Sequence, residues 1–307
     1  MTVHVFAPAT VANVACGFDI FGFALETPGD EIIAHLQEEQ GVTLHNIVEG
    51  KTSLPIDPSK NTAGISVQSF LNHIRSTQGV ALTLHKKMPI GSGLGSSAAS
   101  AAAAVFAVNH LFGTPLSTKE LIPFAMEAEK AACGTAHADN VAPALLGGFV
   151  LIRSYHPLDI IQIPLSLSLY CAVLHPKIMI QTSMARKLLQ KQVALSALVQ
   201  QSGNAAGLIA GLLQGDHALI SRCLEDVIAE PVRSALIPHF ALVKTKALQT
   251  GALGCSISGS GPAIFALTTS HTLAHQVGKA MHDVYMEHHL DAELFISKIN
   301  TQGPSIL

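Results

Sequence analysis

The spacing of apolar residues divides the first half of the chain into alternating strands and helices. Alternation in the stretch VHVFAPAT predicts a strand over residues 3–10, followed by a tight turn over residues 13–17. Residues 31–48 alternate again, with turn chemistry at Glu49-Gly50. Residues 62–77 carry apolar side chains at helical spacing, and residues 80–84 return to strand alternation.

A run of glycine, serine and alanine comes next and predicts a loop that leads into a buried helix. The loop is KKMPIGSGLGSS, residues 86–97, and Ser96 or Ser97 is expected to cap the helix that follows. The sequence GTP ends that helix near residue 111, Thr118 opens another one, and GGFVLI predicts a turn and a strand. The alanine-rich helix can pack closely, as a central helix of a domain would.

The second half, from about Pro164, repeats strand and helix signals in a different order. Strands are predicted over 169–174, 255–258, 263–267 and 294–299, and helices over 183–201, 204–213, 216–228, 239–250 and 272–289. Without the extra helices the order is β-α-β-β-α-β, which is typical of a split βαβ sandwich. We therefore expect an α+β protein with one domain over residues 1–163 and a second over residues 164–307.

Composition restricts the class of protein. The chain has 307 residues, of which 49% are hydrophobic and 13% charged, so it can bury a large core. A net charge of −3 and the lack of a long basic run argue against nucleic-acid binding. The apolar runs are too short to span a membrane, and the first residues do not resemble a signal peptide. Five scattered cysteines predict reduced thiols and a cytoplasmic protein.

The sixteen histidines raise the question of a metal site. His271 and His275 are four residues apart in a predicted helix, a spacing that can bind a metal ion. A solvated helix face explains the same pattern with fewer assumptions, and we predict that role.

The glycine loop differs from two familiar phosphate-binding patterns. It lacks the internal lysine of G-x-x-x-x-G-K-[ST], and Ser96 stands where G-x-G-x-x-G has its third glycine. Glycines still allow close backbone approach, and the following helix start offers free N–H groups to phosphate oxygens. We predict a phosphate cradle formed by Pro89, Ile90, Gly91, Ser92, Gly93, Leu94, Gly95, Ser96 and Ser97.

Three spaced motifs together resemble the GHMP kinase superfamily over nearly the whole chain. They are PATVANVACGFD at residues 8–19, the central P-x-x-x-G-L-G-S-S at residues 89–97, and SISGSGP at residues 256–262. The resemblance implies an ATP-dependent small-molecule kinase. It also implies the GHMP kinase fold, with a ribosomal-S5-like N-terminal ATP-binding domain and a ferredoxin-like C-terminal domain that contributes to the substrate site.

Further segments resemble the homoserine kinases of this superfamily. These are the block EKAACGTAHADNVAP from residue 129, QTSMAR from residue 181, and EPVR from residue 230 followed by LIP. The N-terminal motif departs from the PATSANLGPGFD of those kinases at Val11, Val14 and the pair Ala15-Cys16. The departures leave Asn13, Gly17 and Asp19 in place.

The resemblance implies an acceptor subsite for an amino acid that carries a hydroxyl group. Two arginines can grip a carboxylate in fork geometry, and a carboxylate can neutralise an ammonium group. The resemblance assigns the carboxylate grip to Arg186 and Arg233. It points to Asp19 and Asn13 for the amino end and the hydroxyl, with His137 and Thr182 nearby. The implied reaction is phosphorylation of L-homoserine to O-phospho-L-homoserine in threonine biosynthesis from aspartate.

The resemblance also implies ATP and Mg²⁺ as cofactors. Ser97 and Glu129 are the expected metal ligands, since hydroxyl and carboxylate oxygens suit Mg²⁺, and Glu127 is the rival carboxylate. Lys86 is expected to neutralise phosphate charge, with Lys87 as the alternative, and Asn61 to face the base. Phosphoryl transfer depends mainly on positioning and charge neutralisation.

The general base is left open by the sequence. Asp139 and Asn140 are adjacent, and either can face the acceptor hydroxyl; we expect Asn140 to take part in catalysis and Asp139 to support the site without acting as base. Two other functions stay possible: a mevalonate or sugar kinase of the same superfamily, or a ligand-sensing homologue without catalysis. A homodimer is expected because it is usual in the family.

Overall fold

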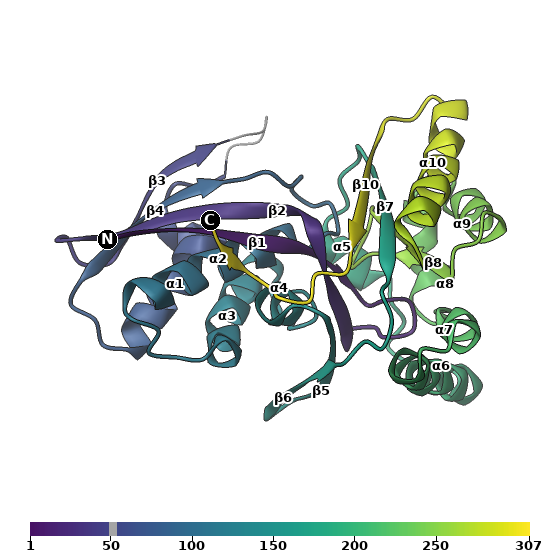
Figure 1. Ribbon diagram of the computed structural model, residues 1–307, viewed down its shortest axis with the longest axis horizontal. Helices are drawn as coiled ribbons and strands as arrows, with labels where there is room; N and C mark the ends of the chain where they lie inside the picture. Colours follow the sequence, from purple (N-terminus) through teal and green to yellow (C-terminus); the bar gives the residue numbers. More distant parts are fainter. Residues whose placement is uncertain (49–53) are drawn as a thin grey trace.

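The computed structural model describes residues 1–48 and 54–307 of the chain. The predicted turn at Glu49-Gly50 lies outside the described residues. Figure 1 shows two sheets side by side, with helices below the first sheet and helices beside the second.

The first half is built on a seven-stranded sheet. Its main path runs in the order β11-β1-β2-β4-β3, and β5 branches from β2 and pairs with β6. The bounds are β1 (Thr2–Ala12), β2 (Phe21–Gln37), β3 (Val42–Val48), β4 (Gly79–His85), β5 (Phe149–Tyr155), β6 (Leu158–Ile163) and β11 (Ser305–Ile306). The pair β3 and β4 is parallel, and the other pairs are antiparallel. The alternation predicted β1, β3, β4 and β5, whereas β6 and the early start of β2 were missed.

The helices of the first half cover one face of this sheet (Figure 1). They are α1 (Thr62–His73), α2 (Ser96–Leu111), α3 (Ile122–Cys133) and α4 (Val141–Leu146), with 3₁₀ turns η1 (Pro58–Lys60) and η2 (Thr118–Leu121). As predicted, α2 is central: its alanines are buried against β1, β2 and the neighbouring helices. The expected caps differ, because Gly95 precedes α2 in the left-handed region without a side-chain cap, and Ser117 rather than Thr118 caps η2.

The second half has a four-stranded antiparallel sheet in the order β10-β7-β9-β8. Its strands are β7 (Tyr170–Pro176), β8 (Gly254–Ile257), β9 (Ile264–Thr268) and β10 (Ala292–Lys298), and α9 (Phe240–Gln249) and α10 (His271–Glu287) pack on it. This arrangement confirms the predicted split βαβ sandwich. Residues in the interior include Leu174, Val243, Ile264 and Met281.

The spacing of apolar residues predicted the helices between β7 and α9 least accurately. The structure has α5 (Thr182–Lys187), α6 (Leu195–Gln214), α7 (His217–Cys223), α8 (Glu230–Arg233) and η3 (Ser234–Leu236), so the predicted helix over 183–201 is wrong. Residues 187–194 are almost all exposed, and no buried apolar face supports a helix there. In contrast, α6 continues through Gly203 because its later turns pack on α7 through Gly207 and Gly211.

After β10 the chain returns to the first sheet, where it forms the last strand. In Figure 1 the chain leaves β10 and runs to β11, which pairs with the edge of β1 opposite β2. The expected division near residue 164 falls in the segment between β6 and β7, and it stays a proposal. Within the described ranges no helix is long and apolar enough to cross a membrane. Four cysteines are buried free thiols: Cys16, Cys171, Cys223 and Cys255.

Candidate functional site

A cavity of about 610 Å³ lies where the two halves meet. It is lined by the end of β1, the start of α2, the end of α3, the segment before α4, the start of α5, and Arg233 with Gly259 and Ser260 from the second half. Every residue that the sequence proposed for the site lines this cavity except Pro89 and Leu94. The Leu94 side chain is fully buried in the core instead, so only its backbone can belong to the cradle.

The glycine loop is held in place by backbone contacts from both halves. Gly91, Gly93 and Gly95 all have positive φ. The Leu94 carbonyl accepts from the amide of Thr10 at 3.0 Å, and the Gly93 carbonyl accepts from the Ser258 hydroxyl at 2.7 Å. A Cβ on Gly93 would lie 2.6 Å from the Ser258 carbonyl oxygen, so this glycine is required by close packing. The motif around Ser258 therefore shapes the loop, a role that the sequence did not reveal.

The start of α2 has the features of an anion site. Its N-cap, Gly95, makes no side-chain hydrogen bond to the first turn, which leaves backbone N–H groups directed at the cavity. The buried Ser96 hydroxyl oxygen has no hydrogen-bond partner among residues 1–48 and 54–307. An orphaned buried hydroxyl next to free amides fits a phosphate group. The correction to the expected serine cap thus supports the phosphate cradle.

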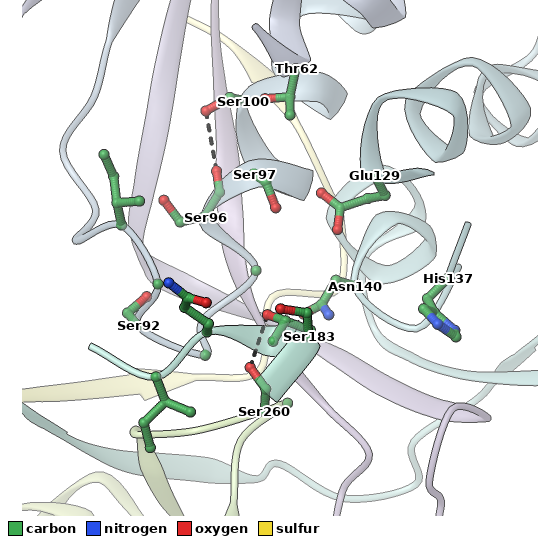
Figure 2. A pocket seen from close by; sticks show the side chains of 18 of the residues that line it. Thr62, Ser92, Ser96, Ser97, Ser100, Glu129, His137, Asn140, Ser183 and Ser260 are labelled. Atoms are coloured by element: carbon green, nitrogen blue, oxygen red, sulfur yellow. Dashed lines mark hydrogen bonds between the residues drawn. The ribbon is translucent and has the colours of Figure 1, made fainter. Parts of the chain in front are cut away.

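Ser97 and Glu129, the two residues expected to bind a metal ion, face each other across the cavity. Figure 2 shows the Ser97 hydroxyl at the start of α2 pointing toward the Glu129 carboxylate on α3. Glu129 is buried and lines the cavity, whereas the rival Glu127 is exposed and does not line it. A hydroxyl and a carboxylate oxygen are the kind of ligands that would suit Mg²⁺. No group of three His, Cys, Asp or Glu residues in the described part of the chain could hold a metal, so His271 and His275 gain no third ligand.

Lys86 lines the cavity but is bound within the protein. Its buried ammonium group donates to the carboxylate of Asp30, to the Ser96 carbonyl at 2.6 Å and to the Ser100 hydroxyl at 2.8 Å. Burial lowers the pKa of Lys86, and the neighbouring Asp30 opposes that shift. All three ammonium donors are used by these contacts, which favours a supporting role over direct binding of phosphate. The alternative, Lys87, is exposed and pairs with Glu31.

At the other end of the cavity, Asp19 and Arg186 form a forked ion pair. The Arg186 guanidinium donates to both carboxylate oxygens of Asp19, at 2.8 and 3.1 Å. Asp19 has a φ of +60°, and its amide donates to the Asn13 side chain at 3.0 Å. The Asn13 amide in turn donates to the Gly259 carbonyl at 2.7 Å. The predicted first motif therefore places Asp19 through a chain of contacts that ends in the third motif.

Arg233 reaches the same end of the cavity from the second half. Its side chain donates to the Gly259 carbonyl at 3.1 Å. Both guanidinium groups lie near the Phe18 ring, with 5.4 Å from the ring centroid to Arg186 and 5.0 Å to Arg233. Cation–π contacts at these distances help to hold two like charges close together. Phe18 and Gly259 were not among the predicted residues, although both lie inside motifs that the sequence analysis identified.

His137 and Thr182 stand beside the forked pair. His137 Nε2 is 2.8 Å from the Thr135 hydroxyl, and His137 Nδ1 is 3.7 Å from an Asp19 oxygen. Burial lowers the pKa of His137, and Asp19 opposes this, so the ring is neutral near pH 7. The Thr182 hydroxyl lies 3.2 Å from that of Ser260, a contact drawn in Figure 2.

Asp139 and Asn140 differ in their surroundings. Burial raises the pKa of Asp139 to about 7, and the nearby carboxylates of Asp19 and Glu129 add to the shift. Asn140 is oriented by Thr10, whose hydroxyl donates to its side-chain oxygen at 2.8 Å. The Asn140 amide nitrogen makes no hydrogen bond to residues 1–48 or 54–307, and the residue lines the cavity (Figure 2). An amide held in this way presents N–H donors to the cavity.

Asn61 lines the cavity, but its side chain is used for structure. It accepts from the Ala63 amide at 3.0 Å as the N-cap of α1, and it donates to the Pro55 carbonyl at 3.0 Å. Both ends of the amide are therefore bound within the protein. This geometry favours a capping role over recognition of the base.

Comparison with known proteins agrees with this geometry. The family model "GHMP kinases N terminal domain" matches residues 61–148, and "GHMP kinases C terminal" matches residues 208–286. A homoserine kinase from Chlorobaculum tepidum is 49% identical, over 100% of this chain and 98% of that protein. The chain belongs to the homoserine kinases of the GHMP kinase family.

Solved structures extend the comparison to the fold. A homoserine kinase from Cytophaga hutchinsonii has 52% identity and a TM-score of 0.97, covering 100% of this chain and 97% of that one. Mevalonate kinase from L. major, solved with R-mevalonate, has a TM-score of 0.71 but only 17% identity, over 97% of this chain and 95% of that one, and so shares the fold alone. These findings confirm the expected GHMP kinase fold and the expected homoserine kinase resemblance.

Within the homoserine kinase family, this chain's departures in the first motif have a structural explanation. The side chains of Val11, Val14, Ala15 and Cys16 are buried in the core behind the turn. These four side chains pack against residues of the second half and do not line the cavity. The motif residues that do line it, Asn13 and Asp19, are unchanged. The departures therefore change the packing behind the site and leave its polar face intact.

Proposed function

We propose that this protein transfers the γ-phosphoryl group of ATP to the side-chain hydroxyl of L-homoserine, giving O-phospho-L-homoserine. The observation that carries this proposal is a single cavity with a phosphate cradle at one end and Asp19, Arg186 and Arg233 at the other. A zwitterionic acceptor needs both signs of charge at its own end. Phosphoryl transfer needs that end to face the cradle.

At the nucleotide end, the chain supplies fixed dipoles and oxygen ligands. The loop over residues 91–97 and the start of α2 would hold phosphate oxygens through backbone N–H groups. Ser97 and Glu129 would hold Mg²⁺, which when bound neutralises charge on the phosphates. Lys86 would keep the start of α2 in place through the Ser96 carbonyl.

At the acceptor end, Arg186 and Arg233 would bind the carboxylate, and Asp19 would bind the ammonium group. In this structure Arg186 already neutralises Asp19. A zwitterion replaces that contact without leaving a charge unpaired, because its carboxylate goes to the arginines and its ammonium to Asp19. A molecule with only one of the two charges leaves Asp19 or Arg186 without a partner.

The hydroxyl of the acceptor would meet Asn140 near the cradle. Because Thr10 takes the Asn140 side-chain oxygen, the amide N–H groups are the ones that can reach the acceptor hydroxyl oxygen. Asn140 therefore orients a lone pair toward the phosphorus and does not remove a proton. A loose transition state requires deprotonation only late in the transfer, so a strong base is not needed.

A coupled ADP-release assay tests the proposal. The wild-type protein is given homoserine, mevalonate, galactose or threonine, each with and without Mg²⁺. We expect turnover with homoserine that depends on the metal, and little with mevalonate or galactose, which lack the paired charges. Failure to turn over homoserine, with turnover of another acceptor, would reject the assignment. Absence of any turnover would favour the ligand-sensing alternative.

Two further features of the expected biology belong to this proposal. We propose a homodimer and a cytoplasmic location, as the family resemblance implied. Analytical ultracentrifugation at micromolar concentration tests the first, since a mass near twice 32.2 kDa is expected. Cell fractionation tests the second.

A further inference from the structure

Asp30 on β2 is a fully buried carboxylate that belongs to none of the sequence motifs. It lies under the phosphate loop, on the sheet side of α2. A buried carboxylate is costly unless several hydrogen bonds satisfy it. Asp30 meets this condition by accepting hydrogen bonds from four donors, which lie on both sides of the phosphate cradle in the chain.

One oxygen of Asp30 holds the chain just before the loop. Oδ1 accepts from the backbone amides of Lys87 at 3.0 Å and Met88 at 3.1 Å. These two residues directly precede Pro89, the first residue of the predicted phosphate cradle. The entry of the loop is thus fixed through its main chain.

The other oxygen of Asp30 holds the chain just after the loop. Oδ2 accepts from the Ser100 hydroxyl at 2.8 Å and from the Lys86 ammonium. Lys86 also donates to the Ser96 carbonyl at 2.6 Å and to Ser100, so the contacts reach the first turn of α2. Figure 2 shows Ser96 and Ser100 together on this turn.

We propose that Asp30 is a positioning residue for nucleotide binding, because its single carboxylate fixes both ends of the phosphate loop. The inference deepens the proposed function and rests on the use of a phosphate-bearing nucleotide. It assigns Lys86 and Ser100 to the same unit. In this unit Lys86 acts on the phosphates through the position of Ser96 and α2.

The competing explanation is an ordinary core ion pair that stabilises the fold and does nothing for the loop. The two explanations differ in what they predict for nucleotide affinity. Ser66 on α1 provides a matched control: it is a fully buried serine whose hydroxyl bonds to the Ala101 carbonyl of α2 at 3.2 Å and to Ala63 at 2.9 Å. It touches the same helix one residue from Ser100 but does not contact the loop anchors.

The test compares Ser100→Ala, Asp30→Asn and Ser66→Ala with the wild-type protein. A fluorescent ADP analogue is titrated without acceptor, thermal unfolding is recorded, and KM is measured for ATP and homoserine. We expect Ser100→Ala to weaken nucleotide binding about fivefold and Asp30→Asn more than tenfold, since buried polar contacts of this kind contribute about that much. Ser66→Ala should lower Tm by a similar amount to Ser100→Ala and leave nucleotide binding within about twofold.

A second comparison keeps the test decisive if Asp30→Asn folds poorly. The double variant Asp30→Asn with Lys86→Met removes both charges, so no buried charge is left unpaired and Tm should recover. Nucleotide affinity should stay low, because the first turn of α2 still lacks the Lys86 contact to the Ser96 carbonyl and the Asp30 oxygen that accepts from Ser100.

Three results have distinct meanings. Wild-type nucleotide affinity in Ser100→Ala and in the double variant would overturn the positioning role, whatever happens to Tm. Raised KM for ATP with homoserine KM unchanged supports it. A wild-type protein that binds ADP but does not phosphorylate homoserine would reject the proposed acceptor alone, since the loop test does not use the acceptor.

Discussion

The two ends of the cavity are built in different ways. The nucleotide end is made of main chain: its glycines, its amides and the start of α2 are held by backbone contacts and by the buried Asp30. The acceptor end is made of side chains, and its central contact, between Asp19 and Arg186, is partly exposed to solvent. The first end is fixed before any ligand arrives, whereas the second must exchange contacts when the acceptor binds.

This difference predicts how each end responds to substitution. A main-chain cradle is damaged by added volume or by loss of a permitted φ angle. A side-chain cradle is damaged by loss of charge or of fork geometry.

Gly93→Ala should damage the nucleotide end most. Gly93 has φ +81°, and an added Cβ would lie 2.6 Å from the Ser258 carbonyl oxygen and 2.9 Å from that of Gly261. The loop must shift away from the second half, at a cost of about 2–3 kcal/mol. We expect kcat/KM for ATP to fall about a hundredfold, with homoserine KM little changed, as steady-state kinetics can show.

Gly134→Ala is the matched control for this change. Gly134 has the same φ of +81°, but an added Cβ would meet no atom within 4 Å. This variant should lose about 1 kcal/mol of stability and keep its ATP kinetics. Equal loss of ATP affinity in both variants would show that backbone strain, and not contact with the third motif, governs the loop.

Arg233→Lys should damage the acceptor end selectively. Lysine keeps the charge but loses the planar fork, the hydrogen bond to Gly259 and much of the contact with Phe18. We expect homoserine KM to rise about thirtyfold, equivalent to about 2 kcal/mol, with nucleotide affinity unchanged. Lys119→Arg, far from the acceptor residues and bonded to the Ile160 carbonyl, serves as the control for a change of cation type. A loss of ADP binding in Arg233→Lys would show that the two ends are not independent.

Thr10→Val probes the link between the ends, because Thr10 contacts Asn140 through its side chain and Leu94 through its amide. Valine keeps the shape and removes the hydroxyl, so the Asn140 amide can turn. We expect kcat to fall about tenfold with both KM values within about twofold, and Thr10→Ser to retain most of kcat. Equal kcat in the valine and serine variants would show that the hydroxyl does not orient Asn140.

The sequence predicted the main-chain nucleotide end and the side-chain acceptor end to different extents. The cradle depends on residues close together in the chain, so the run from Gly91 to Ser97 indicated the loop directly, and the chemistry of Ser97 and Glu129 followed from the family resemblance. Asp30 gave no signal, because its role depends on sheet packing that brings β2 beneath the loop. The fold was predicted well where alternation was strong, and poorly over 187–194, where few apolar side chains are buried.

The acceptor end was predicted in its residues but not in its contacts. The resemblance supplied Asp19, Arg186 and Arg233, which come from three separate segments of the chain. Their spacing does not predict the fork between Asp19 and Arg186, or the contact that both arginines make with the Phe18 ring. Lys86 shows the same limit of prediction from sequence. It was expected to neutralise phosphate charge, but its ammonium group donates to three partners within the protein.

Asp139→Asn should have the smallest effect on catalysis and a clear effect on stability. Because the folded-state pKa of Asp139 is raised to about 7, the folded state keeps a proton that the unfolded state loses near pH 4. The unfolding free energy of the wild type therefore falls as the pH rises from about 4 to about 7. Asparagine removes this dependence, so the variant should gain up to about 4 kcal/mol relative to wild type by pH 8. Chemical denaturation at pH 5 and pH 8 should show about 3 kcal/mol of this change, because the rest of the loss occurs below pH 5.

The same variant decides whether Asp139 acts as the base. We expect kcat to change less than about tenfold, because Asn140 orients the hydroxyl and a loose transition state needs no early proton transfer. A loss of more than about a thousandfold in kcat, with both KM values intact, would make Asp139 the base instead. Asp159→Asn, at a surface ion pair with Arg153, controls for removal of an aspartate and should leave both the kinetics and the pH dependence of stability unchanged. The outcome places proton removal either at the acceptor end of the cavity, with Asp139, or within the transferred phosphoryl group at the nucleotide end.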